Sequence, residues 1–316
     1  MMRVLVTGII PKEGVEKLKE KFDVTYTEGE FSREEVLSKL GEYDGVLLMG
    51  LKADKEFIDA GKKLKIIAVN GVGFDHVDLQ YAKSKGIVVA NVPNAVMEPT
   101  AEMAFTLMLA TTRRILDYDN NMRKGKWLNV SERGNMGFSL YKSTLGIFGM
   151  GRIGKSVAKR AKAFGMEIIY SDPHRLSKEI EDKLGVKYVT FDEMLKKADV
   201  ISVHAPLFES TRHSFSTEEF KKMKNTAFIV NTARGPLIDE KALIKALKEK
   251  EIAGAGLDVF EVEPLEKSEL FNMPNVVLTP HAGTGCLSSR IAISEEATDN
   301  LISFLINNEE KNIVNK

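Results

Sequence analysis

The sequence predicts an α/β protein built from two parallel sheets, each covered by helices on both faces. Short β-branched runs alternate with longer amphipathic stretches along the whole 316-residue chain. The strand runs contain few polar positions, as expected of strands that are buried on both faces. The chain is long enough for two domains of ordinary size, and its strands fall into two series.

The first series contains five expected strands and the second contains six. The first five are expected at Arg3–Thr7, Asp23–Tyr26, Gly45–Met49, Lys65–Val69 and Ile87–Ala90. The next six are expected at Thr144–Phe148, Glu167–Ser171, Val200–Val203, Phe228–Asn231, Ala255–Val259 and Val276–Thr279. Helical patterns such as Gly14–Lys21 and Arg33–Leu40 lie between the strands, and Ser32 is expected to cap the second of these helices. Six strands are the number in a complete dinucleotide-binding sheet.

Two helical stretches fit neither series and are expected to join the domains. One runs from about Thr100 to Met122 and the other from about Ser288 to Ile306. We expect hinges near residues 99 and 285, where the chain would pass between domains. The first domain would then comprise residues 1–99 and 285–316, and the second domain residues 100–284.

Composition argues against several classes of partner and site. Lys plus Arg equals Asp plus Glu at 45 each, so charge gives no reason to expect nucleic acid or an anionic membrane as a partner. Cys286 is the single cysteine, which rules out an intramolecular disulfide and a cysteine-type zinc site and fits a reducing compartment. The chain start lacks signal-peptide features, and no apolar run approaches the roughly 18 residues that span a membrane. We therefore expect a cytoplasmic protein without a metal site.

The segment 149–154, GMGRIG, has the spacing G-x-G-x-x-G. Its position makes the pattern specific, because it follows the expected strand Thr144–Phe148 directly and opens the helical pattern Ile153–Phe164. Such glycines allow a tight turn, close approach of a pyrophosphate and tight packing of helix on strand. The free N–H groups of the helix N-terminus favour phosphate there. The residues expected to bind the cofactor pyrophosphate are Gly149, Gly151, Arg152, Ile153 and Gly154.

Asp172 ends the strand that follows the glycine segment, 23 residues beyond Gly149 (172 − 149). A carboxylate at this position accepts hydrogen bonds from the ribose hydroxyls and repels a 2′-phosphate, which favours NAD over NADP. The alternative is a solvated turn residue before Pro173, since Asp-Pro turns are frequent. Arg175, three residues further on, could reduce this preference for NAD over NADP.

Two histidines directly follow expected strands. His281 lies after the last strand, in Thr-Pro-His-Ala-Gly, beside the expected second hinge, and is the candidate proton donor. Its alternative role is a histidine bonded to loop backbone. For His204, in Val-His-Ala-Pro, packing beside the cofactor is the favoured interpretation.

Three charged residues complete the candidate chemistry. Arg234, between small residues at a strand end, can clamp a carboxylate in two bonds, although a surface ion pair is the alternative. Asp258 interrupts an apolar strand and therefore needs a partner, which the nicotinamide carboxamide could supply. Glu263 lies 18 residues before His281 (281 − 263) and could pair with its imidazole, favouring the protonated form and fixing the tautomer.

With these motifs in this order, the chain resembles the D-isomer-specific 2-hydroxyacid dehydrogenase family over essentially its whole length. The segments that carry the resemblance are Asn70–Asp75, Thr100–Glu102, 149–154 with Asp172, Val203–Pro206, Asn231–Gly235, Gly256–Pro264 and Pro280–Gly283. The resemblance implies a flavodoxin-like substrate domain at 1–99 and 285–316 and a Rossmann domain at 100–284 that binds NAD. It also implies a homodimer formed through the long helix and the loop with Trp127.

The resemblance assigns further roles residue by residue. It implies that Arg234, Glu263 and His281 are the catalytic trio and that amides of Val72 and Gly73 bind the substrate carboxylate. Further residues are implied to border the cofactor: Thr100, Pro206, Thr232, Ala233, Asp258 and Gly283.

Within the family, the strongest likeness is to glyoxylate/hydroxypyruvate and 2-ketogluconate reductases. Phosphoglycerate dehydrogenase is the alternative, but that branch often carries arginines where this chain has Met49 and Val69, and often a C-terminal regulatory domain. Lys52 is a basic residue close to these positions and keeps phosphoglycerate dehydrogenase open as an alternative. Formate dehydrogenases have glutamine where Glu263 stands. A non-enzyme alternative is an NADH-sensing co-repressor, against which the lack of long disordered tails speaks.

Overall fold

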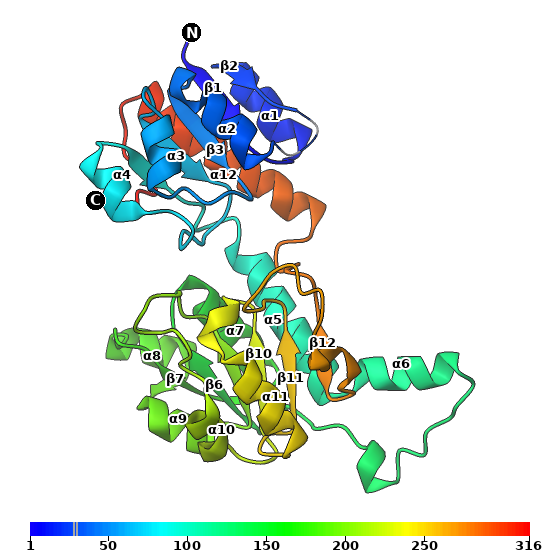
Figure 1. The fold of residues 1–316 in the computed structure, drawn as a ribbon. Helices are drawn as coiled ribbons and strands as arrows, with labels where there is room; N and C mark the ends of the chain where they lie inside the picture. Colours follow the sequence, from blue (N-terminus) through cyan, green and yellow to red (C-terminus); the bar gives the residue numbers. More distant parts are fainter. Residues whose placement is uncertain (28, 30) are drawn as a thin grey trace. The chain divides into compact units, whose positions relative to one another are not determined.

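Two all-parallel sheets organise the chain, each within its own unit of the computed structural model (Figure 1). The structure describes residues 1–27, 29 and 31–316. Unit 1 comprises Met1–Pro99 and Thr284–Lys316, and unit 2 comprises Thr100–Gly283. Two helix-covered parallel sheets are the predicted fold class, which is thus confirmed.

Unit 1 contains a five-stranded sheet with the order β2-β1-β3-β4-β5, which is the flavodoxin-like order. Its strands are β1 (Arg3–Val6), β2 (Asp23–Thr25), β3 (Gly45–Leu48), β4 (Ile66–Val69) and β5 (Val88–Ala90). Its helices are α1 (Lys12–Lys19), α2 (Arg33–Lys39), α3 (Lys55–Ala60), α4 (Leu79–Ser84) and α12 (Leu287–Leu305). Ser32 caps α2 as predicted, because its side chain accepts a hydrogen bond from the Glu35 amide.

The C-terminal segment belongs to the core of unit 1. Leu301 of α12 packs on the strands, and a Cβ at Gly45 would lie 3.0 Å from its Cδ2, so glycine allows the close approach. Beyond the helix, Ile313 forms an antiparallel bridge to Ala90, and the Val89 amide donates to the Asn315 side chain at 2.8 Å. Sequence-distant segments therefore share one core.

Unit 2 contains a seven-stranded sheet with the order β12-β11-β10-β9-β6-β7-β8, a Rossmann order extended by one strand. Its strands are β6 (Thr144–Phe148), β7 (Glu167–Ser171), β8 (Val186–Tyr188), β9 (Val200–Val203), β10 (Phe228–Asn231), β11 (Gly254–Leu257) and β12 (Val276–Leu278). The prediction of six strands missed β8. This edge strand has three residues with an exposed Lys187, too few to form a recognisable pattern.

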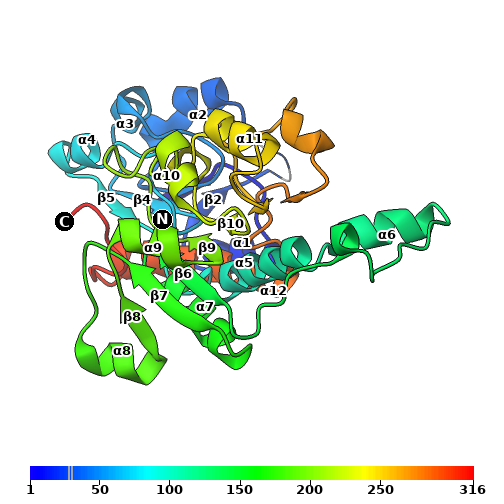
Figure 2. The same cartoon turned by 90° about the horizontal axis from the view of Figure 1, so that it is seen from below.

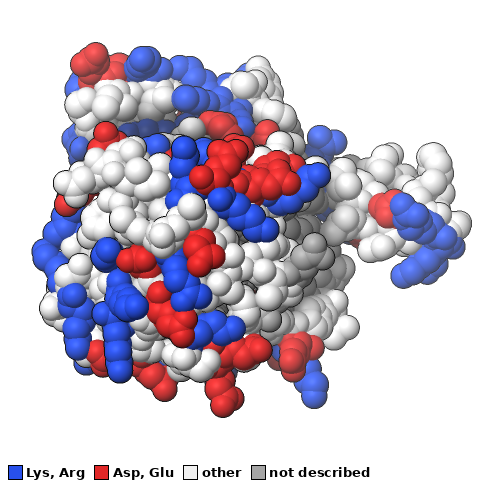
Figure 3. Space-filling model, turned by 90° about the horizontal axis from the view of Figure 1, so that it is seen from above, with Lys and Arg blue, Asp and Glu red and all other residues white. Residues whose placement is uncertain are grey.

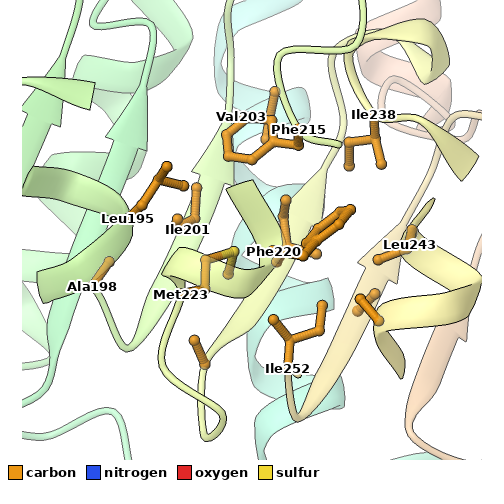
Figure 4. Close-up of a cluster of buried hydrophobic side chains, with 14 of the residues drawn as sticks. Leu195, Ala198, Ile201, Val203, Phe215, Phe220, Met223, Ile238, Leu243 and Ile252 are labelled. Atoms are coloured by element: carbon orange, nitrogen blue, oxygen red, sulfur yellow. The ribbon is translucent and has the colours of Figure 1, made fainter. Parts of the chain in front are cut away.

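Helices cover both faces of the unit 2 sheet. On one face, α9 (Phe191–Lys197), α10 (Thr217–Lys222) and α11 (Glu240–Lys248) enclose an apolar cluster with β9 and β10, part of which Figure 4 shows. On the other face lie α5 (Met97–Thr112) and α7 (Arg152–Ala163). The other helices described in unit 2 are α6 (Ile115–Arg123), α8 (Lys178–Leu184) and the short 3₁₀ helices Arg133–Asn135, Gly235–Leu237 and Glu269–Asn272, while the 3₁₀ helix Leu40–Glu42 lies in unit 1.

The single long helix predicted from about Thr100 to Met122 is wrong, because α5 and α6 are separate helices. Arg114 between them has a left-handed φ of 54°. The carbonyl of Thr112, which would continue the helix, instead accepts the Phe138 amide at 2.7 Å. As a result α6 and the following chain project from the rest of unit 2 as an arm, residues 115–138 (Figures 1 and 2). None of the described helices is long and apolar enough to cross a membrane.

Candidate active site

The predicted site residues of unit 2 other than Thr100 follow the carboxyl ends of its strands. The glycine segment follows β6, Asp172 follows β7, His204 follows β9 and Arg234 follows β10. Asp258 and Glu263 follow β11, while His281 and Gly283 follow β12. In an open parallel sheet these ends lie along one edge, which is where ligands bind.

The three glycines of segment 149–154 have different surroundings. Gly149 has a φ of 95°, and a Cβ there would lie 2.6 Å from the Ala205 amide nitrogen. A Cβ at Gly154 would lie 2.4 Å from the Gly149 carbonyl oxygen. At Gly151 a Cβ would meet no heavy atom within 4 Å, so this side of the turn is open. The turn therefore has the tight backbone and the free approach that a pyrophosphate at the N-terminus of α7 requires.

Two buried polar atoms after the neighbouring strands β9 and β10 have no hydrogen-bond partner among the described residues. They are Oγ1 of Thr232, after β10, and Nδ1 of His204, after β9. Buried polar atoms are rarely left unpaired unless a ligand or water completes them. Both residues were predicted to border the cofactor, so the open turn and the unpaired atoms together fit a bound dinucleotide.

Asp172 connects β7 to the glycine turn. Its Oδ2 accepts the Met150 amide at 2.8 Å, and its Oδ1 accepts the His174 amide at 2.7 Å. The second bond is the local turn that the alternative interpretation expected, but the first reaches the glycine turn that was predicted to bind the pyrophosphate. A carboxylate has lone pairs left for ribose hydroxyls after two such bonds.

His204 is a neutral residue at neutral pH. Its Nε2 lies 2.7 Å from the Ser202 hydroxyl, which is itself fully buried. Burial lowers the pKa of His204 to about 3. Such an imidazole cannot serve as the proton donor near neutral pH. Pro206, two residues on, is exposed, and its carbonyl accepts the Thr211 hydroxyl at 2.8 Å.

His281 and Glu263 form a close pair. Nδ1 of His281 lies 2.7 Å from Oε2 of Glu263, and Oε1 of Glu263 accepts the Phe260 amide at 3.0 Å. Burial acts to raise the pKa of Glu263, but the bonds from His281 and Phe260 and the charges of His281 and Arg234 outweigh it and hold the pKa below its usual value. The Nδ1 contact leaves Nε2 as the ring nitrogen that faces away from Glu263.

Asp258 fixes the segment that carries His281. Its carboxylate accepts the Thr279 hydroxyl at 2.5 Å and the amides of Ala282 and Gly283 at 2.8 Å each. Its backbone carbonyl accepts the His281 amide at 2.8 Å. The partner predicted for this buried acid was the nicotinamide carboxamide, but three protein donors already satisfy most of the carboxylate.

Gly283 and Thr100 lie beside the Asp258 carboxylate. A Cβ at Gly283 would be 3.1 Å from Oδ2 of Asp258 and 3.8 Å from Oγ1 of Thr100. The structure therefore brings together these three predicted cofactor residues, and only a glycine fits between the other two without displacement.

The Arg234 turn depends on two residues that sequence reasoning gave no role. The buried Asn231 donates from Nδ2 to the Arg234 carbonyl at 2.9 Å, and its Oδ1 accepts the Ala233 amide at 3.0 Å. A Cβ at Gly235 would lie only 1.8 Å from the Phe260 carbonyl oxygen. Gly235 thus allows the turn after β10 to touch the segment that carries Glu263. The signal was present in Asn-Thr-Ala-Arg-Gly, but the contact joins distant segments and no local pattern reveals it.

Val72 and Gly73 lie in unit 1, so their binding of a substrate carboxylate stays a prediction. The carbonyls of Gly71 and Val72 accept the Val92 amide and the Asn91 side chain at 2.9 and 2.8 Å. These bonds hold the 71–73 turn to the end of β5 through its carbonyls.

Comparison with known proteins gives one consistent family. The model of the D-isomer specific 2-hydroxyacid dehydrogenase NAD binding domain matches residues 105–283. A glyoxylate reductase from Korarchaeum cryptofilum is 42% identical over 99% of this chain and 96% of its own length. A solved glyoxylate reductase from Paecilomyes thermophila is 36% identical with a TM-score of 0.90, covering 99% of this chain and 98% of that one. An NADPH-dependent glyoxylate/hydroxypyruvate reductase from Sinorhizobium meliloti, solved with NADP and malonate, is 33% identical with a TM-score of 0.89, covering 99% and 96%.

The neutral, partly buried His204 should make the fold sensitive to acid. Its folded-state pKa of about 3 lies below the ordinary 6.5, so only the unfolded chain takes up a proton as the pH falls between these values. Stability is therefore lost as the pH falls through this window, at up to about 1.4 kcal/mol per pH unit. We expect His204→Gln to reduce this slope in urea unfolding between pH 6 and 4 by roughly 1 kcal/mol per unit. His174→Gln, at an exposed position, should keep the parent's slope; equal slopes for all three proteins would refute the assignment.

Proposed function

The chain belongs to the D-isomer-specific 2-hydroxyacid dehydrogenase family, and we propose that it reduces a small 2-keto acid, glyoxylate or hydroxypyruvate, with NADH. Members of this family are oxidoreductases that act on a CH–OH group with a nicotinamide dinucleotide. The observation that carries the proposal is the 2.7 Å pair of His281 and Glu263 at the same sheet edge as the open glycine turn. The substrate follows from the relatives, which are described as glyoxylate or glyoxylate/hydroxypyruvate reductases.

Each member of the proposed trio has one task in the reducing direction. The dinucleotide, when bound, supplies a hydride for C2 of the keto acid. His281 donates a proton from Nε2 to the carbonyl oxygen, and Glu263 stabilises the imidazolium through Nδ1. Arg234 binds the carboxylate and stabilises the developing negative charge, because its guanidinium stays charged and offers paired donors.

The cofactor preference rests on Asp172. One solved relative is described as NADPH-dependent and another was solved with NAD, so the family accommodates either cofactor. In this proposal the Asp172 carboxylate faces the position that the 2′-phosphate of NADP would take. Its bonds to the Met150 and His174 amides hold it beside the glycine turn. We propose that NADH is the working reductant.

The arm supports a homodimer. Six of its apolar side chains are exposed, with Trp127 at 85%: Ile115, Leu116, Met122, Trp127, Val130 and Met136. Figure 3 shows the arm as a mostly uncharged surface with basic residues toward one side. A projecting segment with this much exposed apolar surface needs a partner, and we propose that the partner is a second copy of the chain.

Substitution of the trio tests the proposed reaction in the reduction of glyoxylate and hydroxypyruvate. His281→Ala should lose roughly 10²–10⁴-fold in kcat while NADH still binds. Arg234→Ala should raise the keto-acid KM and lower kcat, because the guanidinium acts on both the bound substrate and the transition state.

Glu263→Gln gives the diagnostic pH effect. The bond to His281 and its charge help to lower the pKa of Glu263, and because this interaction is mutual, removing the Glu263 charge weakens the proton-donating form of the pair. The alkaline limb of the kcat profile should therefore move to lower pH. An unmoved limb, with hydride transfer shown to limit the rate, would remove the pair from the role of acid.

Steady-state kinetics test the cofactor preference. We expect NADH to exceed NADPH by at least about tenfold in kcat/KM, equivalent to about 1.4 kcal/mol. The Asp172 carboxylate should cause this difference through repulsion of the 2′-phosphate. Equal efficiency with both cofactors would contradict the assignment of Asp172.

Sedimentation tests the role of the arm. The parent should sediment as a dimer, and Leu116→Asp with Trp127→Ser should shift it toward the monomer, because charge and lost apolar area weaken the contact. Phe271→Ser, which removes an exposed aromatic residue outside the arm, should leave the dimer intact. A monomeric parent would refute the proposal.

A further inference from the structure

Glu181 is a buried carboxylate that the proposed reaction does not use. It lies on α8, and the residue is only 3% exposed. Its Oε1 accepts the Tyr170 hydroxyl at 2.7 Å and Arg175 Nε at 3.0 Å, while its Oε2 accepts Arg175 Nη2 at 3.0 Å. The guanidinium of Arg175 is therefore bound in two parallel bonds, the strongest geometry for such a pair.

Glu181, Arg175 and Tyr170 form a cluster whose carboxylate is ionised over the neutral pH range. Arg175 first, and then Tyr170, lower the pKa of Glu181 to about 2 by hydrogen bonding. Burial and the bond to Glu181 raise the pKa of Tyr170 to about 12. The Arg175 guanidinium also lies 5.2 Å from the centre of the Tyr188 ring. Arg175 is thus held by an ionised carboxylate and by an aromatic ring.

The position of Arg175 relates this cluster to the proposed cofactor site. It follows Asp172 by three residues, across the turn in which the Asp172 carboxylate accepts the His174 amide. In dinucleotide-binding folds, an arginine near this acidic position accommodates the 2′-phosphate of NADP. This step rests on the proposed function, which places the adenosine ribose at Asp172.

We propose that Glu181 is a specificity-determining residue that withholds the Arg175 guanidinium from the 2′-phosphate of NADP(H). Two of the N–H donors of Arg175 and its charge are committed to Glu181. Turning Arg175 toward a phosphate would leave Glu181 ionised and buried without a cationic partner, with only the Tyr170 hydroxyl still bonded to it, which is strongly unfavourable. The chain therefore excludes the phosphorylated cofactor twice, by repulsion at Asp172 and by the pairing of Arg175 with Glu181.

This arrangement has a consequence for cofactor engineering. Replacement of Asp172 alone removes the repulsion but does not release Arg175. Replacement of Glu181 by glutamine keeps an acceptor for the Tyr170 hydroxyl and removes the charge that holds the guanidinium. Only the two changes together should create a 2′-phosphate site.

Nucleotide binding by calorimetry tests the proposal without the chemical step. The probes are 2′,5′-ADP and 5′-AMP, which differ only in the 2′-phosphate. Asp172→Ser/Glu181→Gln should bind 2′,5′-ADP at least about tenfold more tightly than Asp172→Ser, with 5′-AMP affinity within about twofold. Asp172→Ser/Glu179→Gln is the matched control, because Glu179 is an exposed residue of the same helix; it should gain less than about threefold.

Arg175→Met identifies the group responsible. Added to Asp172→Ser/Glu181→Gln, it should abolish the gain. Added to Asp172→Ser alone, it should change 2′,5′-ADP affinity by less than about twofold, because Arg175 is already withheld. This comparison decides the matter even if the glutamine variant does not fold. The proposal about Glu181 is overturned if adding Arg175→Met to Asp172→Ser lowers 2′,5′-ADP affinity tenfold. It is also overturned if Asp172→Ser/Glu181→Gln folds but gains no 2′,5′-ADP affinity over Asp172→Ser.

The same measurements separate this proposal from the proposed function. If Asp172→Ser strengthens 2′,5′-ADP binding relative to 5′-AMP but Glu181→Gln adds nothing, Glu181 is not a specificity residue and the placement of the ribose stands. If Asp172→Ser leaves that ratio unchanged, the ribose does not lie at Asp172, and both proposals fall.

Discussion

The buried carboxylate of Asp258 is the interaction on which the arrangement of the site depends. It lies at the end of β11 and bonds to the segment after β12 at Thr279, Ala282 and Gly283. His281 lies between these anchors with a left-handed φ of 51°, a conformation that costs of the order of 1–3 kcal/mol outside glycine. Hydrogen bonds to a charged group contribute roughly 1.5–3 kcal/mol each, enough to offset this cost. The position of the candidate proton donor is therefore imposed by its neighbours.

A second contact extends this constraint to the rest of the trio. Since β10, β11 and β12 are neighbours in the sheet, the segments that follow them lie side by side. Gly235 meets the Phe260 carbonyl without a side chain between them, and the Phe260 amide donates to Glu263. The turn of Arg234, the segment of Glu263 and the segment of His281 are thus joined by the Gly235–Phe260 backbone contact and by the bonds of the Glu263 carboxylate. A substitution that moves one of these segments should therefore also move the other two.

Features that depend on local pattern were predictable from the sequence. The continuous apolar runs of the buried strands and the glycine spacing after β6 each have a physical cause within a few residues. The sequence predicted that Asp258 needs a hydrogen-bond partner, because it is an acid in an apolar strand. The sequence did not identify the donors. The edge strand β8 was missed because it is too short to form a pattern. Two other missed features involve contacts that no local pattern reveals: the break at Arg114, where Phe138 bonds to the Thr112 carbonyl, and the cluster of Glu181, whose pattern on α8 resembles that of a solvated glutamate.

A double-mutant cycle of Asp258→Asn and Glu263→Gln tests the central claim, that Asp258 holds His281 against Glu263. The measured quantity is the single-turnover rate of keto-acid reduction at saturating NADH. If Asp258 acts through the pair, the double variant should lose little more than Asp258→Asn alone, with a coupling of at least about 1 kcal/mol. If the two losses simply add, Asp258 and Glu263 act independently, and the account of how the site is positioned is wrong.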